Sequence, residues 1–282
     1  MNNKNITIID KKGKFFRDYF FDIFRSKFLI YELVKKDFKI AYTQTILGPI
    51  FFILVPVIQS LVFTFFTNSF NIKEINGLPT FLFFLLGTTI WNFIYNSTTK
   101  CSQVLILNRK LISKVYFNRI IFFVVSILIS FIHFVINFVT LIIFLLYYKF
   151  YYNFDIINFN INISILPFVI LLSAIFSFSI GIIFASASIK YRDLSYGVPF
   201  IFQILMFLSP VLYPMESLNS RIYLVAIFNP MTSLLELFRY IFINNYNFSL
   251  EVLSLNVLQI FILFVIGLHF FRYIDKKISD LI

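Results

Sequence analysis

The sequence has few residues of the kinds that perform chemistry. Its 282 residues include one cysteine, two histidines and seven glycines, and only 13% are charged. The single cysteine, Cys101, excludes a disulfide within the chain. No two glycines have the spacing of GxxxxGK[ST], so the loop that cradles phosphates in many nucleotide hydrolases is absent. The sequence also lacks CxxC, HExxH and clustered carboxylates, so we expect no catalytic residue, no metal site and no bound cofactor.

Charged residues are also missing from the middle of the long apolar runs. Ion-coupled carriers usually hold a titratable group or an ion cage at that depth, so a self-contained carrier is disfavoured. His133 lies within one run, where it is either a proton relay or a hydrogen-bonding partner of a neighbouring helix. Uphill transport by this chain would therefore need an outside source of energy.

Apolar residues dominate what is present, at 60% of the chain with 21% aromatic. Runs of about 20 apolar residues are long enough to cross a bilayer as helices. The sequence thus predicts an all-α integral membrane protein with six transmembrane helices and one re-entrant helical segment at residues 209–249. The expected spans are residues 46–66, 80–99, 120–148, 163–189, 194–208 and 251–271.

The first 45 residues differ from the rest and are expected to form a cytoplasmic tail followed by amphipathic helices. In residues 28–42 the apolar side chains of Phe28, Tyr31 and Val34 recur at helical spacing, with lysines between them. A basic amphipathic helix is typical of the membrane interface. Packing against a partner protein is the alternative. Residues 46–282 are expected to form a single transmembrane domain.

Two prolines, Pro210 and Pro214, follow the fifth expected span. Proline removes a backbone donor and clashes with the preceding turn, so we expect the helix to break near Ser209. Further on, Glu236 and Arg239 are three residues apart and would be neighbours on a helix. They either form a charged gate that closes an exit on the extracytoplasmic side of the membrane, or they cap short re-entrant helices. The gate candidates are Pro210, Pro214, Glu236 and Arg239.

The positive charges are unevenly distributed between the expected loops. Of the 24 Lys and Arg residues, 10 precede the first span, 5 lie in residues 100–119, 2 in residues 190–192 and 3 in the C-terminal tail. The other side holds Lys73, Lys149, Arg221 and Arg239. Because positive loops remain in the cytoplasm, both termini are predicted to be cytoplasmic. The net charge of +11 is thus explained by topology, and no nucleic-acid partner is expected.

Four small residues repeat every fourth position in the fourth expected span: Ser173, Ser177, Gly181 and Ala185. Such a ridge allows two helices to approach closely in lipid. It indicates either a helix seam within one subunit or a contact between two subunits.

Three stretches together resemble one family, the ABC-2-type permeases that export bacterial surface polysaccharides. The first is DFKIAYTQTILG, residues 37–48, and the second is NRKLISKVYFNR, residues 108–119. In the second, Asn118 replaces the usual proline of the family. The third runs from KYRD at residues 190–193 to SPVLYP at residues 209–214, with NPMTS at residues 229–233. The resemblance covers about residues 28–271.

The resemblance implies a homodimer of six-span subunits in the inner membrane, surrounded by membrane lipids. Each subunit would dock on a separate ATPase subunit that binds the ATP and Mg. The substrate would be O-antigen, a capsule or a teichoic-acid-like polymer, often attached to a polyprenyl diphosphate lipid. The expected contacts with the ATPase are Asn108, Lys110, Lys114, Tyr116, Tyr191, Arg192 and Asp193.

A sugar chain has polar hydroxyls and apolar ring faces, so its conduit should offer aromatic and neutral polar groups. The candidates are Gln59, Trp91, Asn92, Tyr95, Asn96, Tyr196, Gln203 and Tyr213. Aromatic belts at the membrane interface and amide bonds between helices explain the same residues without a conduit. The alternative functions are an ABC-2 permease for a small drug or lipid, a secondary carrier, and a membrane-bound glycosyl- or acyltransferase.

Overall fold

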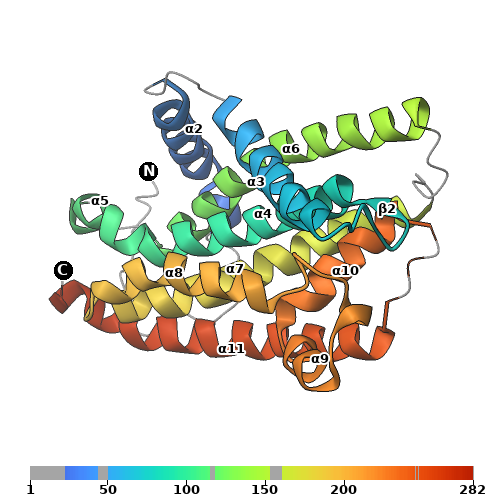
Figure 1. Ribbon diagram of the computed structural model, residues 1–282. Helices are drawn as coiled ribbons and strands as arrows, with labels where there is room; N and C mark the ends of the chain where they lie inside the picture. Colours follow the sequence, from blue (N-terminus) through green and yellow to red (C-terminus); the bar gives the residue numbers. More distant parts are fainter. Residues whose placement is uncertain are drawn as a thin grey trace.

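The computed structural model describes residues 23–43, 50–114, 118–152, 161–244, 246 and 248–281. These residues are almost all helical (Figure 1). The described part holds one small sheet, in which β1 (Glu74–Ile75) pairs antiparallel with β2 (Leu78–Pro79). Asn76 and Gly77 connect the strands with φ of 51° and 74°. Positive φ at both central residues is the geometry of a type I′ turn, for which Asn-Gly is the preferred pair.

A helix occupies each of the six predicted spans. By length and apolarity, α3 (Ile50–Ser69), α6 (Ile120–Tyr151), the part Leu250–Tyr273 of α11 and the helical segment Asn162–Ser188 could each cross a membrane. The bent pair α9 (Ser220–Ile227) and α10 (Pro230–Phe242) is a fifth candidate. Among the described residues, four helices pass this test, or five spans if the bent pair counts as one, so the protein is a multi-pass membrane protein. The six helices are α3 (Ile50–Ser69), α4 (Thr80–Leu107), α6 (Ile120–Tyr151), α7 (Leu166–Ser188), α8 (Asp193–Leu208) and α11 (Leu250–Leu281), with the 3-10 helix η1 (Ile161–Ile165) before α7.

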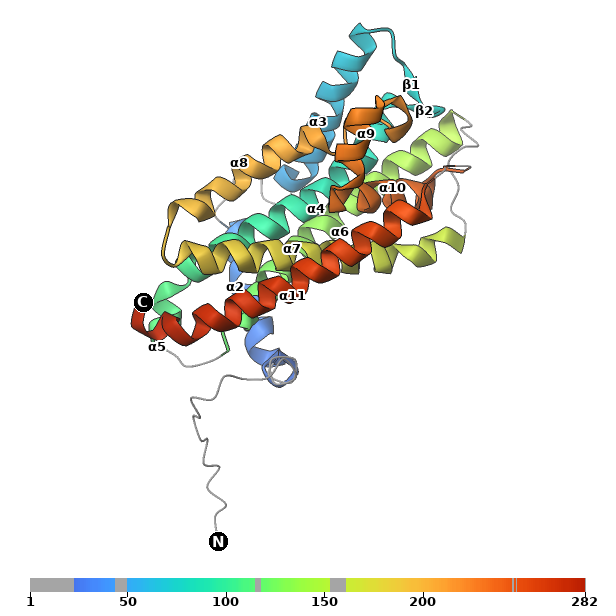
Figure 2. The same cartoon turned by 90° about the horizontal axis from the view of Figure 1, so that it is seen from below.

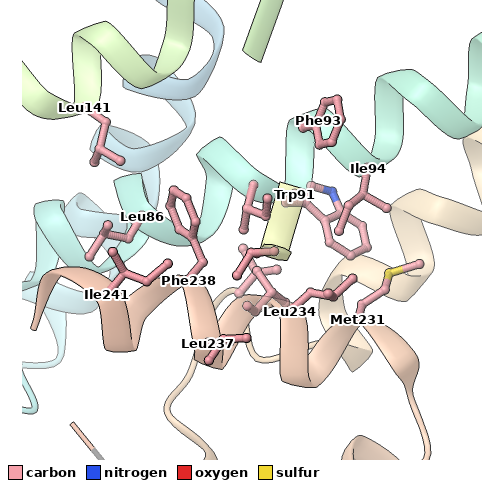
Figure 3. Close-up of a cluster of buried hydrophobic side chains, with 14 of the residues drawn as sticks. Leu86, Trp91, Phe93, Ile94, Leu141, Met231, Leu234, Leu237, Phe238 and Ile241 are labelled. Carbon is pink, nitrogen blue, oxygen red and sulfur yellow. The ribbon is translucent and has the colours of Figure 1, made fainter. Parts of the chain in front are cut away.

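Helix α4 forms the centre of the bundle and packs on α3, α6, α7, α8 and α10. Its side chains from Thr80 to Ile94 are buried without a break, including Thr88, Thr89 and Asn92. A helix enclosed by other helices needs no apolar surface toward lipid, and polar groups within it can bond to neighbouring helices. This position explains why α4 is less apolar than α3, α6 and α7. Figure 3 shows Trp91 and Leu86 of α4 facing Leu234 and Phe238 of α10.

The ridge of small residues on α7 packs against α4 within the same chain. The hydroxyl of Ser177 donates to the carbonyl oxygen of Ile94 at 3.4 Å. A Cβ atom added at Gly181 would overlap the Cβ atom of Cys101. Glycine is therefore required at this crossing, and the ridge is a helix seam inside one subunit.

The basic stretch at residues 100–119, expected as a loop, is largely helical over its described residues. Helix α4 continues to Leu107 and the short helix α5 (Arg109–Lys114) follows. Val104 and Leu105 are buried in a cluster with Phe123 of α6 and Ile182 of α7. Packing of these side chains extends the helix beyond the apolar run.

The amphipathic helix α2 (Lys27–Thr43) packs on α6 in an orientation that differs from the expected one. Ile30, Leu33 and Val34 contact Ile121 and Val125. Phe28 and Tyr31, expected on the same apolar face as Val34, are 75% and 61% exposed. The helix is apolar over more than one face, so the periodicity alone did not identify the packed side. Its location in the membrane interface stays a prediction, and Phe15–Asp22 lie outside the described residues.

The segment after α8 is interrupted, as the prolines predict. Helix α8 ends at Leu208, and η2 (Met215–Ser217), α9 (Ser220–Ile227) and α10 (Pro230–Phe242) follow. Helices α9 and α10 meet at 92°. Asn229 fixes this corner, because its side chain accepts from the Met231 amide at 3.1 Å and donates to the Ser209 hydroxyl at 2.8 Å. In Figure 2, α9, β1 and β2 lie at the end of the bundle away from α5 and the C-terminus.

Candidate functional site

A buried arginine occupies the break between α8 and η2. Arg239, on α10, is 0% exposed. Its Nη1 atom donates to the carbonyl oxygen of Pro210 at 2.5 Å, and its Nη2 atom donates to that of Val211 at 3.0 Å. Carbonyl groups at the end of a helix have no partner within the helix. The guanidinium therefore satisfies backbone oxygens that follow the end of α8.

Helix α4 provides the other wall around the guanidinium. The ring of Phe83 lies with its centroid 3.8 Å from Cζ of Arg239, within cation–π range. One turn along, a Cβ atom at Gly87 would lie 3.0 Å from Nη2 of Arg239 and 3.1 Å from the carbonyl oxygen of Val211. The absence of a side chain at Gly87 thus leaves the room that the guanidinium occupies.

Glu236 balances the charge of Arg239. Its Oε1 atom lies 3.1 Å from Nη1 of Arg239, and its Oε2 atom accepts from the Tyr246 hydroxyl at 2.7 Å. Burial raises the pKa of Tyr246, so this hydroxyl remains protonated and donates. Because a buried charge is stable only when paired and hydrogen-bonded, these contacts hold α10, the α8 break and the segment after α10 together.

The pairing of Glu236 with Arg239, predicted from their spacing, is thus present. Their contacts are those of a cap on the broken helix, and a gating role stays a prediction. Pro210 belongs to this cluster, whereas Pro214 is half-buried and precedes η2. Sequence reasoning missed the other members, Phe83, Gly87, Val211 and Tyr246. A glycine in the interior of a buried helix was the one available signal, since glycine weakens helices.

The conduit candidates fall into two groups. The first is buried between helices: the side-chain amide of Asn92 donates to Oε1 of Gln59 at 3.1 Å, which joins α4 to α3. Trp91 is 3% exposed and its ring lies 6.2 Å from that of Phe202 on α8. These contacts agree with the alternative explanation for these residues, in which they bond and pack between helices and do not line a conduit.

The second group of conduit candidates is accessible. Tyr196 and Gln203 lie exposed on α8, while Tyr95 and Asn96 on α4 are half-buried. Tyr213, between α8 and η2, is also half-buried. Because α8 packs on α4, the accessible candidates on these two helices lie on neighbouring elements. Their lining role stays a prediction.

The expected ATPase contacts occupy two segments, and a hydrogen bond connects residues that lie close to them in the sequence. Lys110 is exposed on α5, and Asn108 donates to the carbonyl oxygen of Val104 at 3.0 Å. Tyr191, Arg192 and Asp193 are exposed where α8 begins. Gln103 of α4 donates to the carbonyl oxygen of Ser195 at 3.4 Å, which holds the two segments near each other. Lys114 ends α5 but its side chain is outside the described part, as is the whole of Tyr116.

The C-terminal helix reaches the same end of the bundle. Arg119, before α6, donates to the backbone oxygen of Asp275 at 3.0 Å and forms an ion pair with its carboxylate. In Figure 1 the C-terminus lies beside α5, and β2 and α10 lie at the opposite end. The basic segments after α4, before α8 and near the C-terminus therefore gather at one end.

A second polar contact inside the bundle involves a residue that was not singled out from the sequence. Nζ of Lys100, on α4, lies 3.2 Å from Nδ1 of His133 on α6, and the ring of Phe52 stacks on the imidazole at 3.9 Å. His133 is thus held between three helices. The contact agrees with the interhelical bond considered for His133.

Apolar helices around a polar central helix, with basic segments at one end, define the class: a polytopic helical membrane protein. Within this class, the chain belongs to the ABC-2 type transporter family, whose model matches residues 29–243. The family is one of transport permeases.

Curated relatives extend the match along the chain. The chain is 24% identical to an O-antigen export system permease protein RfbA of Klebsiella pneumoniae, over 96% of this chain and 99% of that protein. A second protein of that name and organism is 22% identical over the same shares. A protein of the same name from Myxococcus xanthus is 24% identical over 78% of this chain and 82% of its own.

Proposed function

We propose that this chain is the membrane-spanning subunit of an ATP-driven exporter that moves a surface polysaccharide such as O-antigen, in lipid-linked form, across the inner membrane. The observation that carries the proposal is the end-to-end alignment, which covers 96% of this chain and 99% of two O-antigen export permeases.

ATP hydrolysis belongs to a separate subunit in this proposal, because the sequence has no phosphate-binding glycine loop. The ATPase would dock at the end of the bundle that carries α5 and residues 191–193. Lys110, Tyr191 and Arg192 are exposed there. Exposed charges beside an aromatic ring suit a polar protein interface.

The proposed topology has six spans with both termini in the cytoplasm and α9 and α10 as the re-entrant segment. It counts α4 and α8 as spans, although neither passes the test of length and apolarity. The buried position of α4 explains its polar composition, and the 16 residues of α8 reach about 24 Å at 1.5 Å per residue. The gathering of basic segments at one end supports this orientation.

The proposed assembly is a homodimer with the polymer conduit near α3 and α8. Both helices have large exposed apolar side chains, among them Phe65 on α3 and Phe200 and Phe207 on α8. Tyr196 and Gln203 lie on the same helix as these phenylalanines. A face that combines aromatic rings with neutral amides suits the apolar ring faces and hydroxyls of a sugar chain.

Deletion of the coding sequence in its native cell tests the proposed function. The cell surface should lose its polysaccharide, and the lipid-linked polymer should accumulate inside, both measured by immunoblotting of surface and cytoplasmic fractions. Expression of the chain in trans should restore the surface signal. An unchanged surface polysaccharide, with altered export of a small drug or lipid instead, would favour the alternative ABC-2 substrate.

A further inference from the structure

A cavity whose walls are mostly apolar but carry several polar groups lies beside the Arg239 cluster, at the end of the bundle opposite α5. We call it the α10 pocket. It has a volume of about 350 Å³, is open on one side, and is lined by residues of η2, α9, α10 and the first turn of α11. Glu216, Tyr223, Ser233, Glu236 and Phe248 form its walls. The volume is near the lower end of the ~300–1,000 Å³ range of small-molecule sites, which suits a single ring better than a chain.

One wall group of the α10 pocket lacks a partner. The hydroxyl of Ser233 is buried, with the residue 4% exposed, and has no hydrogen-bond partner in the part of the chain that the structure describes. The neighbouring Thr232, in contrast, donates to the carbonyl oxygen of Ala226 at 2.6 Å. A buried hydroxyl without a partner is destabilising. Ser233 is therefore a group that a polar ligand in the pocket could satisfy.

The other walls combine carboxylates with aromatic rings. Glu216 is exposed at the pocket, and Glu236 contributes its buried carboxylate. Phe248 packs on Tyr240 with ring centroids 4.7 Å apart, which fixes the orientation of its ring. Carboxylates accept hydrogen bonds from hydroxyl groups, and aromatic rings cover apolar surface. A sugar ring offers both kinds of surface.

Other ligand classes fit less well. Two carboxylates disfavour an anion, and Arg239 is directed away from the pocket toward Pro210 and Val211. Among the described residues, no group of three His, Cys, Asp or Glu side chains could hold a metal ion. Two other cavities, one between α6, α7 and α11 and one between α7, α8 and α9, are lined almost wholly by apolar side chains and suit lipid instead.

We propose that the α10 pocket binds one neutral sugar unit of the exported polymer. The inference rests on the proposed function, and it adds a binding site outside the accessible conduit candidates on α4 and α8. Glu216 lies three residues after Tyr213, a conduit candidate, on the same connecting segment. A polymer that passes Tyr213 would thus reach the pocket as it leaves the bundle.

Photo-crosslinking in cells that express the full transporter tests this site, with the exported glycan itself as the probe. A photoreactive phenylalanine derivative replaces Tyr223 in the pocket, Tyr213 beside it, or Tyr147 as the control. Tyr147 is an exposed aromatic residue on α6. Antibody against the glycan should detect a protein–glycan adduct at position 223 and not at position 147.

A second variant separates binding from mere proximity. Ser233→Ala removes one hydrogen-bonding group without leaving a buried donor unsatisfied, so folding should be preserved. The adduct at position 223 should fall about fivefold, the effect of one neutral hydrogen bond. The matched control, Ser254→Ala, changes an exposed serine on α11 and should leave the yield unchanged.

The outcomes distinguish the pocket from the proposed function. An adduct at position 213 without one at position 223 would overturn the sugar site and leave polysaccharide export in place. Equal yields at positions 223 and 147, or no effect of Ser233→Ala, would also overturn it. If no position forms an adduct and the cells display their polysaccharide without this chain, the proposed function itself is wrong.

Discussion

The guanidinium of Arg239 donates to the carbonyl oxygen of Pro210 at 2.5 Å, across 29 positions of sequence. This bond connects a helix of the interrupted segment to the end of another helix. A backbone oxygen that is buried away from water is stable only when a hydrogen-bond partner satisfies it. Arg239 donates the hydrogen bonds that such oxygens need. Glu236, Phe83 and Gly87 make the burial of its guanidinium possible.

Replacement of Arg239 by methionine should therefore destabilise the protein strongly. The change leaves the carboxylate of Glu236 buried without its cationic partner, for which a loss of about 3–5 kcal/mol is typical. Thermal unfolding of the purified chain in detergent measures the loss. Arg221→Met is the matched control, because Arg221 is exposed on α9. Equal melting temperatures for the two variants would contradict the structural role of Arg239.

Gly87→Ala and Gly197→Ala should have opposite effects. A Cβ atom at Gly87 would lie 3.0 Å from Nη2 of Arg239 and 3.1 Å from a backbone oxygen, whereas at Gly197 nothing lies within 4 Å. Overpacking costs about 1–3 kcal/mol, and replacing glycine in an open helix gains about 0.5–1 kcal/mol. The same melting assay compares them. A Gly87→Ala variant as stable as the parent would show that the guanidinium is not confined by α4.

The two groups of conduit candidates should respond differently to leucine. Asn92→Leu breaks the bond to Gln59 and should lower stability by about 0.6 kcal/mol, the typical worth of such a bond between membrane helices. Tyr196→Leu and Gln203→Leu change exposed side chains and should slow polymer export while subunit assembly remains intact. Export is measured as surface glycan per folded transporter. Normal export by both α8 variants would remove α8 from the conduit.

Charge reversal at the basic end should uncouple the ATPase. The double variant Lys110→Glu, Arg192→Glu should reduce co-purification of the ATPase subunit, since both side chains are exposed there. Lys73→Glu serves as the control, because Lys73 directly precedes β1 at the opposite end of the bundle. Undiminished binding and unchanged stimulation of ATP hydrolysis by the double variant would show that the ATPase docks elsewhere.

Local pattern predicted the positions of the helices, but not all their ends or contacts. The apolar runs and the two prolines located six helices and the break after Leu208, because span length and loss of backbone bonding are local properties. The extension of α4 to Leu107 depends on packing of Val104 and Leu105 against distant helices. The orientation of α2 depends likewise on which of its apolar faces α6 covers.

The candidate site was predictable only in part, for a similar reason. Glu236 and Arg239 are three residues apart, so their pairing followed from helical geometry. Phe83 and Gly87 lie about 150 positions from Arg239 in the sequence, and no periodicity connects them. Only the way α10 packs on α4 brings these residues together.

Transport by purified components tests the central claim, that this chain forms the passage and a separate ATPase drives it. Liposomes would contain the chain alone or together with its ATPase subunit, with lipid-linked glycan in the outer leaflet and ATP supplied or withheld. The account predicts that glycan moves across the bilayer only when both the ATPase subunit and ATP are present. Translocation by the chain alone, without ATP, would contradict it.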